Sequence, residues 1–266
     1  DHRDLHSFPT RRSSDLPLVR PDTMEAEAVH RLLVIAKEAD APVMVVHLTN
    51  KKAFEEVMRA RANGQEVYAE TCPQYLLLDD SVYAKPDFQG AVYVCAPPIR
   101  KKEDQDCLWE ALSREDIQTV ATDQCSFTLA QKALGKDDFT KIPGGLPGVQ
   151  TRGTLLYTYG VKEGRITQEQ MCKLLSENPA KLYGVYPQKG VLAPGSDADI
   201  VVLDPEKESV ISAATHAYNT DNNPFEGFRL RCGIDKVFLR GNLAVDDGQL
   251  VKEKLGKYIA RGKKQM

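Results

Sequence analysis

Short apolar runs alternate with amphipathic segments through the first half of this chain. Three runs predict strands, because each is short and ends at polar or turn-forming residues: Val43–Thr49, Val67–Thr71 and Ile117–Thr122. The segments 51–62 and 103–113 that separate them predict helices, and a further helix is expected over residues 22–37. A weaker run, Ala91–Cys95, predicts one more short strand. Strands that alternate with helices are typical of parallel βα units, so the pattern predicts an α/β fold.

The sequence changes character after Lys189. Two helices are expected before this point, near residues 150–160 and 167–176, and Asn178-Pro179 is expected to interrupt the chain after them. Four later runs, separated by Gly, Pro, Asp and Asn, predict short strands: Ala198–Leu203, Ser209–Ile211, Lys236–Leu239 and Leu243–Val245. We interpret residues 188–251 as part of a small β-sandwich domain, and residues 252–266 as a tail that forms a solvated helix or a frayed end.

The first sixteen residues, Asp1–Leu16, have no hydrophobic period. Over its whole length this string resembles one reading frame of a common short-read sequencing adapter. We therefore interpret residues 1–16 as a non-native segment, which removes His2 and His6 from the candidate ligands. The same interpretation predicts that the natural protein begins upstream of Pro17.

Charge and cysteine content disfavour several classes of protein. The chain has 35 Lys and Arg residues against 38 Asp and Glu residues, for a formal charge of -3, which gives no basic surface for nucleic acid. No apolar run approaches the roughly 18 residues that a bilayer crossing needs. The six cysteines form no Cys-x-x-Cys pair, so cysteine-ligated zinc is not expected. We interpret them as reduced thiols of a cytoplasmic protein.

Two side chains near predicted strand ends are candidates for chemistry. His47 lies near the end of its apolar run, and Asp123 directly follows another. In a parallel barrel the carboxyl ends of the strands face the active site, where a His and an Asp can bind a metal or move a proton. Taken singly, each also has a structural interpretation, His47 as a hydrogen-bonded core histidine and Asp123 as a helix or turn cap. His30 and His216 are expected to be structural.

Longer motifs carry a more specific signal. The following segments resemble the cyclic amidohydrolases: Val45–Thr49, Glu70–Leu76, Cys95–Arg100, Thr122–Phe127, Gln131–Lys132, Gly135–Pro143, Asn178–Gly184, Gly195–Ile200 and Phe225–Gly227. The stretch 123–143 is similar to dihydropyrimidinases and D-hydantoinases in particular. The resemblance covers the chain from Pro17 to its end. It implies the C-terminal part of a TIM-like (β/α)8 barrel, about strands 6–8, over residues 17–187. A whole barrel needs roughly 250 residues, so three such units would be only part of one.

The resemblance also implies a chemistry, the hydrolysis of the cyclic amide bond of dihydropyrimidines or hydantoins at a centre of two zinc ions. His47 would bind the more exposed zinc, and Asp123 would bind the more buried one and carry the proton. The main chain at Ala96 and Gly144 would hold the cyclic ureide substrate. The family's remaining ligands are a His-x-His pair, a strand-5 histidine and a carbamylated lysine that bridges the metals. Those ligands and a supporting tyrosine belong to strands that this chain does not contain.

Two other functions remain open at this point. Allantoinases and dihydroorotases share several of the motifs, but they tend to carry His where this chain has Gln74, and they favour Asp-His-Ser-Pro where it has Asp123–Ser126. Non-enzymatic, dihydropyrimidinase-like scaffold proteins share the fold but have lost metal ligands, whereas His47 and Asp123 are present here. The resemblance further implies a homotetramer in the intact protein, with no nucleic-acid or membrane partner.

Overall fold

The computed structural model describes residues 12–266, so eleven of the sixteen residues assigned above to a non-native segment lie outside the described part. The chain divides into two compact units, which are considered separately. Unit 1 comprises residues up to Leu108 together with Thr122–Val149 and Ser212–Glu226, and unit 2 comprises the rest. The domain boundaries expected from the sequence stay a prediction.

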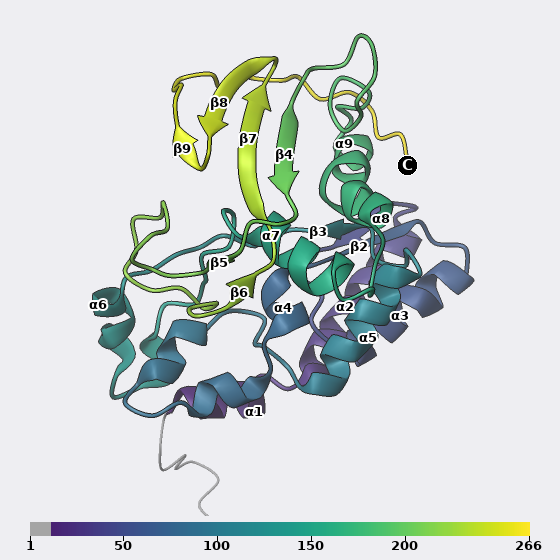
Figure 1. Ribbon diagram of the computed structural model, residues 1–266. Helices are drawn as coiled ribbons and strands as arrows, with labels where there is room; N and C mark the ends of the chain where they lie inside the picture. The colour runs from purple at the N-terminus through teal and green to yellow at the C-terminus, as the bar shows by residue number, and fades with distance from the viewer. Residues whose placement is uncertain (1–11) are drawn as a thin grey trace, which may run out of the picture. The chain divides into compact units, whose positions relative to one another are not determined.

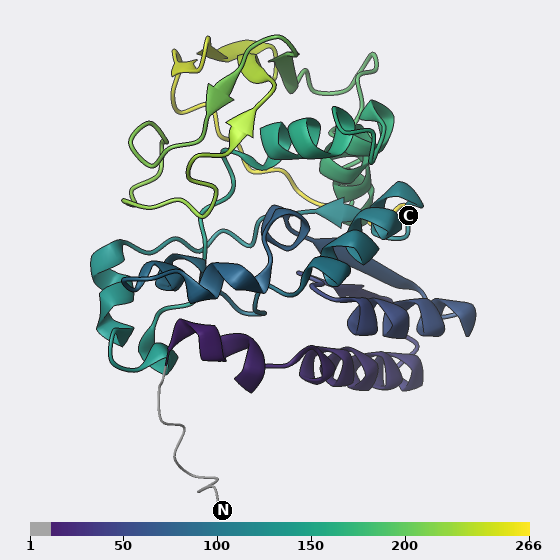
Figure 2. The ribbon, with the colours of Figure 1, turned by 60° about the horizontal axis from the view of Figure 1, so that its bottom comes forward.

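Unit 1 contains the first parallel βα unit. After a 3-10 turn, η1 (Ser13–Asp15), and a short helix, α1 (Leu16–Val19), the order is α2 (Asp22–Glu38), β1 (Val43–Val45), α3 (Lys51–Ala62) and β2 (Val67–Thr71). Strands β1 and β2 pair in parallel, with Val43 opposite Val67 and Val45 opposite Ala69. Helices α2 and α3 lie side by side (Figure 2). The apolar face of α3 is buried, as the sequence pattern predicts.

Strand β1 is shorter than the predicted run Val43–Thr49. It ends at Val45, because His47 adopts a left-handed backbone conformation with φ of 42° that a strand does not accommodate. Within the predicted run, Val46 is 43% exposed. Contact with β2 resumes at Leu48, whose amide donates to the Glu70 carbonyl at 2.7 Å.

Most of the segments between β2 and residue 149 are short helical turns. They comprise α4 (Pro73–Leu77), η2 (Asp80–Ala84), η3 (Gln89–Tyr93), α6 (Leu129–Lys132), η4 (Ala133–Gly135) and η5 (Phe139–Lys141). The expected strand Ala91–Cys95 is therefore wrong, because most of it belongs to the 3-10 turn η3. Between these segments lies α5 (Lys102–Ser113), close to its predicted position. The predicted strand Ile117–Thr122 is reduced to the two residues of β3 (Thr119–Val120).

Unit 2 contains a helix that passes through a proline. The helix begins as α8 (Gln168–Cys172), widens into a π-helical turn, η7 (Lys173–Glu177), and continues as α9 (Asn178–Leu182). The expected interruption at Asn178-Pro179 is wrong. A proline inside a regular helix clashes with the carbonyl four residues before it, and the widened turn gives that carbonyl room. A second π-helical turn, η6 (Tyr157–Val161), extends α7 (Arg152–Leu156).

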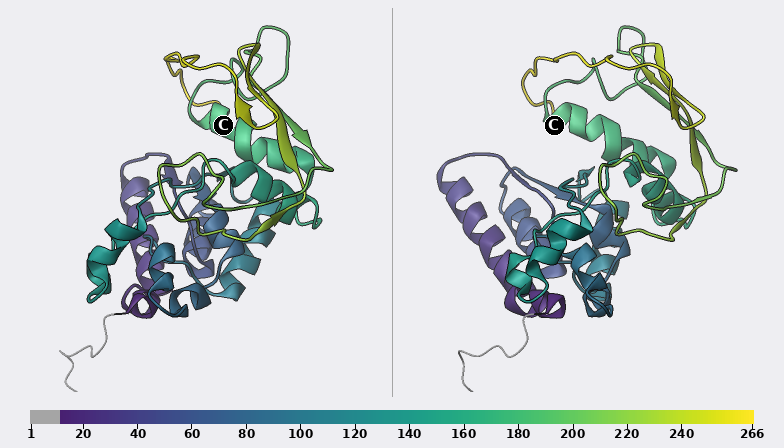
Figure 3. Two further views of the ribbon diagram at one scale, coloured as in Figure 1. Left: turned by 60° about the vertical axis from the view of Figure 1, so that its left-hand side comes forward. Right: turned by 90° about the vertical axis from the view of Figure 1, so that its left-hand side faces the viewer.

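The remainder of unit 2 contains two antiparallel sheets joined by turns and irregular chain (Figures 1 and 3). A four-stranded sheet has the order β4-β7-β8-β9, with bounds Ile200–Asp204, Gly233–Leu239, Asn242–Asp246 and Gln249–Leu250. A two-stranded sheet pairs β5 (Ser209–Val210) with β6 (Arg229–Leu230).

The tail 252–266 forms no helix, and the Gly262 amide donates to the Gly184 carbonyl at 2.6 Å. Among residues 12–266, no helix has the length and apolarity that a membrane crossing requires.

One buried ion pair joins three segments of unit 1. The Arg100 guanidinium lies 3.0 Å from the Glu25 carboxylate of α2, and it also donates to the hydroxyl of Thr49 at 3.1 Å. A third donor of Arg100 reaches the Arg20 carbonyl. Glu25 in turn accepts the Thr49 amide at 2.9 Å and the Thr49 hydroxyl. The pair thus fixes the loop after β1 to the first turn of α2.

We predict that Arg100→Met lowers the free energy of unfolding by about 3–5 kcal/mol, because it leaves the Glu25 carboxylate buried without its partner. Urea unfolding of the purified chain measures the change. The matched control is Arg31→Met, whose i,i+4 partner Glu27 is 61% exposed, and it should change stability by less than about 1 kcal/mol. Adding Glu25→Met to the first variant should recover part of the loss. Equal, small effects of Arg100→Met and Arg31→Met would contradict the prediction.

Candidate active site

His47 occupies a strained position directly after β1. Its φ of 42° is unusual for a residue other than glycine, and such conformations persist only where the surroundings hold them. The next residue supplies that hold, because the Leu48 carbonyl accepts the Thr71 hydroxyl at 2.8 Å while its amide bonds to β2. The His47 ring is half-buried, and no residue in the described part of the chain forms a hydrogen bond with it.

Asp123 shares this backbone conformation. It follows β3 by three residues, has a φ of 51°, and is exposed. The residue before it is fixed by Gln74, whose side-chain amide donates to the Thr122 carbonyl at 3.2 Å. The residue after it is fixed as well, because the Gln124 side chain accepts the Gly148 amide at 2.7 Å. Within residues 12–266 the Asp123 carboxylate has no hydrogen-bond or ion-pair partner.

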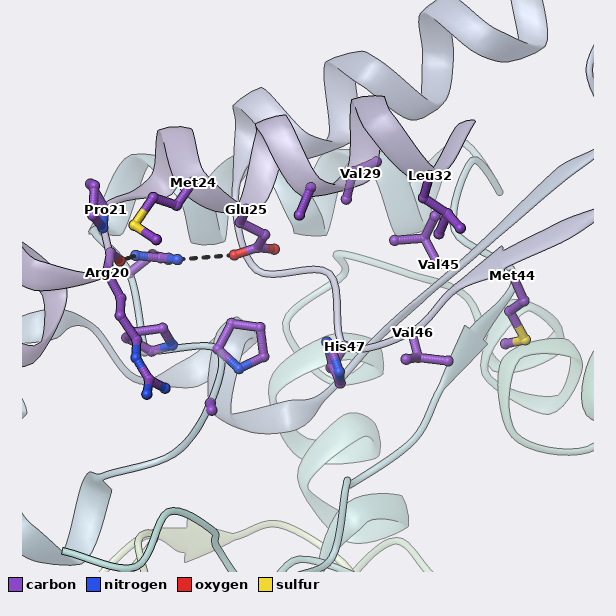
Figure 4. A pocket seen from close by; sticks show the side chains of 15 residues that line it. Arg20, Pro21, Met24, Glu25, Val29, Leu32, Met44, Val45, Val46 and His47 are labelled. Atoms are coloured by element: carbon purple, nitrogen blue, oxygen red, sulfur yellow. Dashed lines mark hydrogen bonds and ion pairs between the residues drawn. The ribbon is translucent and has the colours of Figure 1, made fainter. Parts of the chain in front are cut away.

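A cavity of about 540 Å³ opens beside His47. Its walls come from α2, from β1 and the residues after it, and from the loop that contains Ala96 and Arg100. Figure 4 shows Met24, Glu25 and Leu32 of α2 on one side and Val46 and His47 on the other. The walls are mainly apolar, and the charged groups among them belong chiefly to the ion pair described above.

The two expected substrate-binding positions are neighbours. A Cβ atom added to Gly144 would lie 3.9 Å from the Ala96 amide nitrogen and 3.7 Å from the Cys95 Cα. The Ala96–Pro97 peptide is cis, and the Pro97 carbonyl accepts the Tyr75 hydroxyl at 3.0 Å. Ala96 also lines the cavity with His47. The fold therefore brings His47, Ala96 and Gly144 into one region.

Cys95 is buried next to Ala96 in this region. Burial is the main reason why the pKa of its thiol rises to about 11, and the Asp123 carboxylate also raises it. The Tyr75 and Tyr83 hydroxyls and the Lys132 ammonium act in the opposite direction. At neutral pH the group is therefore a thiol, which makes Cys95 a packing residue and not a nucleophile.

The donor types of His47 and Asp123 fit part of a metal centre. An imidazole nitrogen and a carboxylate oxygen are both ordinary zinc ligands, and neither side chain is used by a described neighbour. However, residues 12–266 contain no group of three or more His, Cys, Asp or Glu side chains that could hold an ion. The described residues can therefore supply two ligands at most, and any further ligands would have to come from elsewhere.

Sequence reasoning missed three residues that position this region. Arg100 and Lys132 lie within longer motifs that assign them no role, and no motif includes Glu25. All three are charged and buried or nearly so, which is rare unless a partner is present. The sequence gives no direct signal for the partner, because Glu25 and Arg100 are 75 residues apart.

Comparison with known proteins identifies the family. Residues 20–244 match the model of the Amidohydrolase family. The chain is 46% identical over 248 residues to a D-hydantoinase of Geobacillus stearothermophilus, which covers 92% of this chain and 53% of that protein. It is also 46% identical over 237 residues to a D-hydantoinase of Streptomyces coelicolor, which covers 89% of this chain and 50% of that protein. The chain thus spans about half the length of the curated relatives it matches.

Solved structures give the same result. The dihydropyrimidinase from Brevibacillus agri NCHU1002 superposes with a TM-score of 0.89 at 44% identity, covering 90% of this chain and 52% of that one. A D-hydantoinase structure superposes with a TM-score of 0.94 at 42% identity, covering 96% and 56%. The superposition and the matched residues define a partial TIM-barrel α/β fold. The chain belongs to the amidohydrolase family, and within it the chain is similar to D-hydantoinases and dihydropyrimidinases.

We predict that Gly145→Ala destabilises the chain by more than about 2 kcal/mol. Gly145 has a φ of 153°, and a Cβ atom there would lie 2.1 Å from the Cys125 carbonyl oxygen, so the loop beside Gly144 would have to move. Urea unfolding measures the loss. Gly153→Ala is the matched control, because a Cβ atom on Gly153 in α7 meets nothing within 4 Å, and it should change stability by no more than about 1 kcal/mol.

Proposed function

We propose that this chain is the C-terminal portion of a zinc-dependent hydrolase that opens the cyclic amide bond of hydantoins or dihydropyrimidines. One observation carries the proposal. Two donor side chains, His47 and Asp123, follow strands on left-handed backbone, and no described residue uses either of them. Strained positions of this kind concentrate at functional sites. The hydantoinases that resemble this chain supply the reaction class and the substrate class.

In this proposal His47 and Asp123 are two of the ligands of a binuclear zinc centre. Bound zinc would lower the pKa of water and polarise the ring carbonyl. The Asp123 carboxylate takes the proton of the attacking water and gives it to the ring nitrogen as the carbon–nitrogen bond breaks. The exposure of Asp123, and its lack of a described partner, leave its oxygens free for this transfer.

The cyclic ureide would be held by the main chain at Ala96 and Gly144. Amide and carbonyl groups of the backbone match the alternating donors and acceptors of a ureide ring. Their position beside the His47 cavity supports the assignment. Recognition by the main chain also accommodates Ala and Gly at these two positions, because neither side chain is needed.

The remaining parts of the centre would come from the rest of an intact protein. The relatives are about twice as long as the matched region, and the parallel units described here would correspond to about strands 6–8 of the barrel. The wall of the His47 cavity supports this, because Met24 is 57% exposed and Leu32 42%, as expected for apolar side chains that a further segment covers. We infer that the intact protein is a homotetramer, as the resemblance implies.

We predict different consequences for the two ligands in the proposed intact protein, in which residues 17–266 are joined to an N-terminal part like that of the relatives. Asp123→Asn keeps one oxygen ligand but removes the base, so turnover should fall by about 10²–10⁴-fold while zinc is retained. His47→Ala removes a neutral ligand, so zinc content should fall first. Steady-state hydrolysis of hydantoin and dihydrouracil, with zinc content measured on the same samples, separates the two effects. An Asp123→Asn protein with full zinc and near-normal turnover would exclude Asp123 as the proton carrier.

We also predict that the 266-residue chain by itself hydrolyses neither substrate and binds less than one zinc ion per chain. Two ligands are too few for a stable zinc site. Equilibrium dialysis against zinc and a hydrolysis assay test this, with the Geobacillus stearothermophilus D-hydantoinase as the positive control. Hydrolysis by the purified 266-residue chain would overturn the assignment of the missing ligands to another part of the protein.

A further inference from the structure

Lys132 is the most deeply buried charged side chain in the described residues. Only 1% of it is exposed, although lysine is among the residues least often fully buried. No carboxylate in residues 12–266 forms an ion pair with it. Burial lowers the pKa of its ammonium to about 8, so the group is still mostly charged at neutral pH. A buried, unpaired charge costs folding free energy, and other groups must therefore satisfy it.

Three main-chain carbonyls satisfy the ammonium. The Lys132 Nζ atom donates to the carbonyls of Val94 at 3.2 Å, Pro143 at 3.1 Å and Gly145 at 3.1 Å. An ammonium has three donors, so the set is complete. The Phe127 ring lies on a further side, with its centroid 5.8 Å from the Nζ atom. Its negative face stabilises the same charge.

The three carbonyls flank both expected substrate-binding positions. Pro143 and Gly145 are the residues on either side of Gly144, and Val94 precedes Ala96 by two residues. The two loops also touch directly, because the Gly145 amide donates to the Val94 carbonyl at 2.9 Å. One ammonium therefore holds the loop of Ala96 and the loop of Gly144 at a fixed spacing.

The segment around α6 places the Lys132 side chain beside these carbonyls. Thr128 and Gln131 form a capping box at the start of α6, which sets the direction of the helix. Gly135 then lies against Ile142, where an added Cβ atom would be 2.4 Å from the Ile142 amide nitrogen. The segment is thereby folded back, which brings Pro143 to the Lys132 side chain.

We propose that Lys132 is a positioning residue for substrate binding, and that its ammonium sets the spacing between the main-chain groups of Ala96 and Gly144 that hold the ring. This rests on the proposed function for the identity of the substrate. If Lys132 only satisfied its own buried charge, carbonyls of one of the two loops would be enough. The ammonium instead reaches the residues on both sides of Gly144 and the loop of Ala96, and it does not touch the candidate ligands His47 and Asp123.

The test compares Lys132→Met with the matched control Lys136→Met, an exposed lysine of the same segment. Methionine fills a similar volume but donates no hydrogen bond, and its flexible chain tolerates the site. Hydrogen–deuterium exchange of the 266-residue chain follows the Gly145 amide, with the Leu48 amide as the distant reference. Steady-state kinetics of the intact protein with hydantoin supply kcat and KM separately.

In Lys132→Met we expect the Gly145 amide to exchange at least about tenfold faster, with the Leu48 amide unchanged. KM should rise about tenfold and kcat should change little. The reason is that a looser spacing of the main chain at Ala96 and Gly144 weakens binding of the ground state and of the transition state alike. Lys136→Met should match the wild type in both measurements.

Three results would overturn the proposal. Unchanged exchange at Gly145 would mean that Lys132 does not hold the two loops, and equal acceleration at Gly145 and Leu48 would mean that it only supports the fold. A fall in kcat at constant KM would also exclude a positioning role in binding. If the wild-type intact protein does not hydrolyse hydantoin, the proposed function fails, whereas the exchange result still decides whether Lys132 holds the loops.

Discussion

The ion pair between Arg100 and Glu25 is the constraint on which the arrangement around His47 depends. Thr49 accepts a hydrogen bond from Arg100 and donates two to Glu25. These bonds fix the position of the main chain two residues after His47. That position requires a sharp departure from β1, and the left-handed conformation of His47 provides it. The strain at His47 is thus balanced by buried electrostatic contacts close by, and the side chain is held at the cavity without hydrogen bonds of its own.

Lys132 has the corresponding role for the main chain at Ala96 and Gly144. In both places a buried cation binds oxygen atoms of segments far apart in sequence. The partners differ in kind, because Arg100 meets a carboxylate whereas Lys132 meets neutral carbonyls. A guanidinium is always charged and suits a carboxylate, whereas an ammonium is a compact charge that three carbonyls can surround. Each cation therefore matches the geometry of the groups that it joins.

Local sequence patterns predict the regular elements well and their interruptions poorly. The strand β2 and the helices α2, α3 and α5 have nearly the expected bounds, because apolar periodicity and turn residues determine them. β1 ends early because a long-range network holds His47 in its strained conformation, and the helix passes Pro179 because a π-helical turn precedes it. Neither feature leaves a periodic signal. Ala91–Cys95 has the composition of a strand, but its main chain forms a 3-10 turn instead.

The candidate site was predictable to the extent that its residues are named by motifs. His47, Asp123 and Ala96 lie in such motifs and Gly144 directly follows one, whereas the residues that support them cannot be predicted from motifs. A motif gives the residue types that occur together, and the motif Gln131-Lys132 does not indicate the direction of either side chain. In the fold the two adjacent residues have opposite tasks: Gln131 caps α6 at the surface, and Lys132 turns inward to the three carbonyls. Successive residues of a helix point roughly 100° apart, so a shift of one residue would turn the lysine away from the three carbonyls. The motif is therefore specific because burial at Lys132 and capping at Gln131 must be satisfied together.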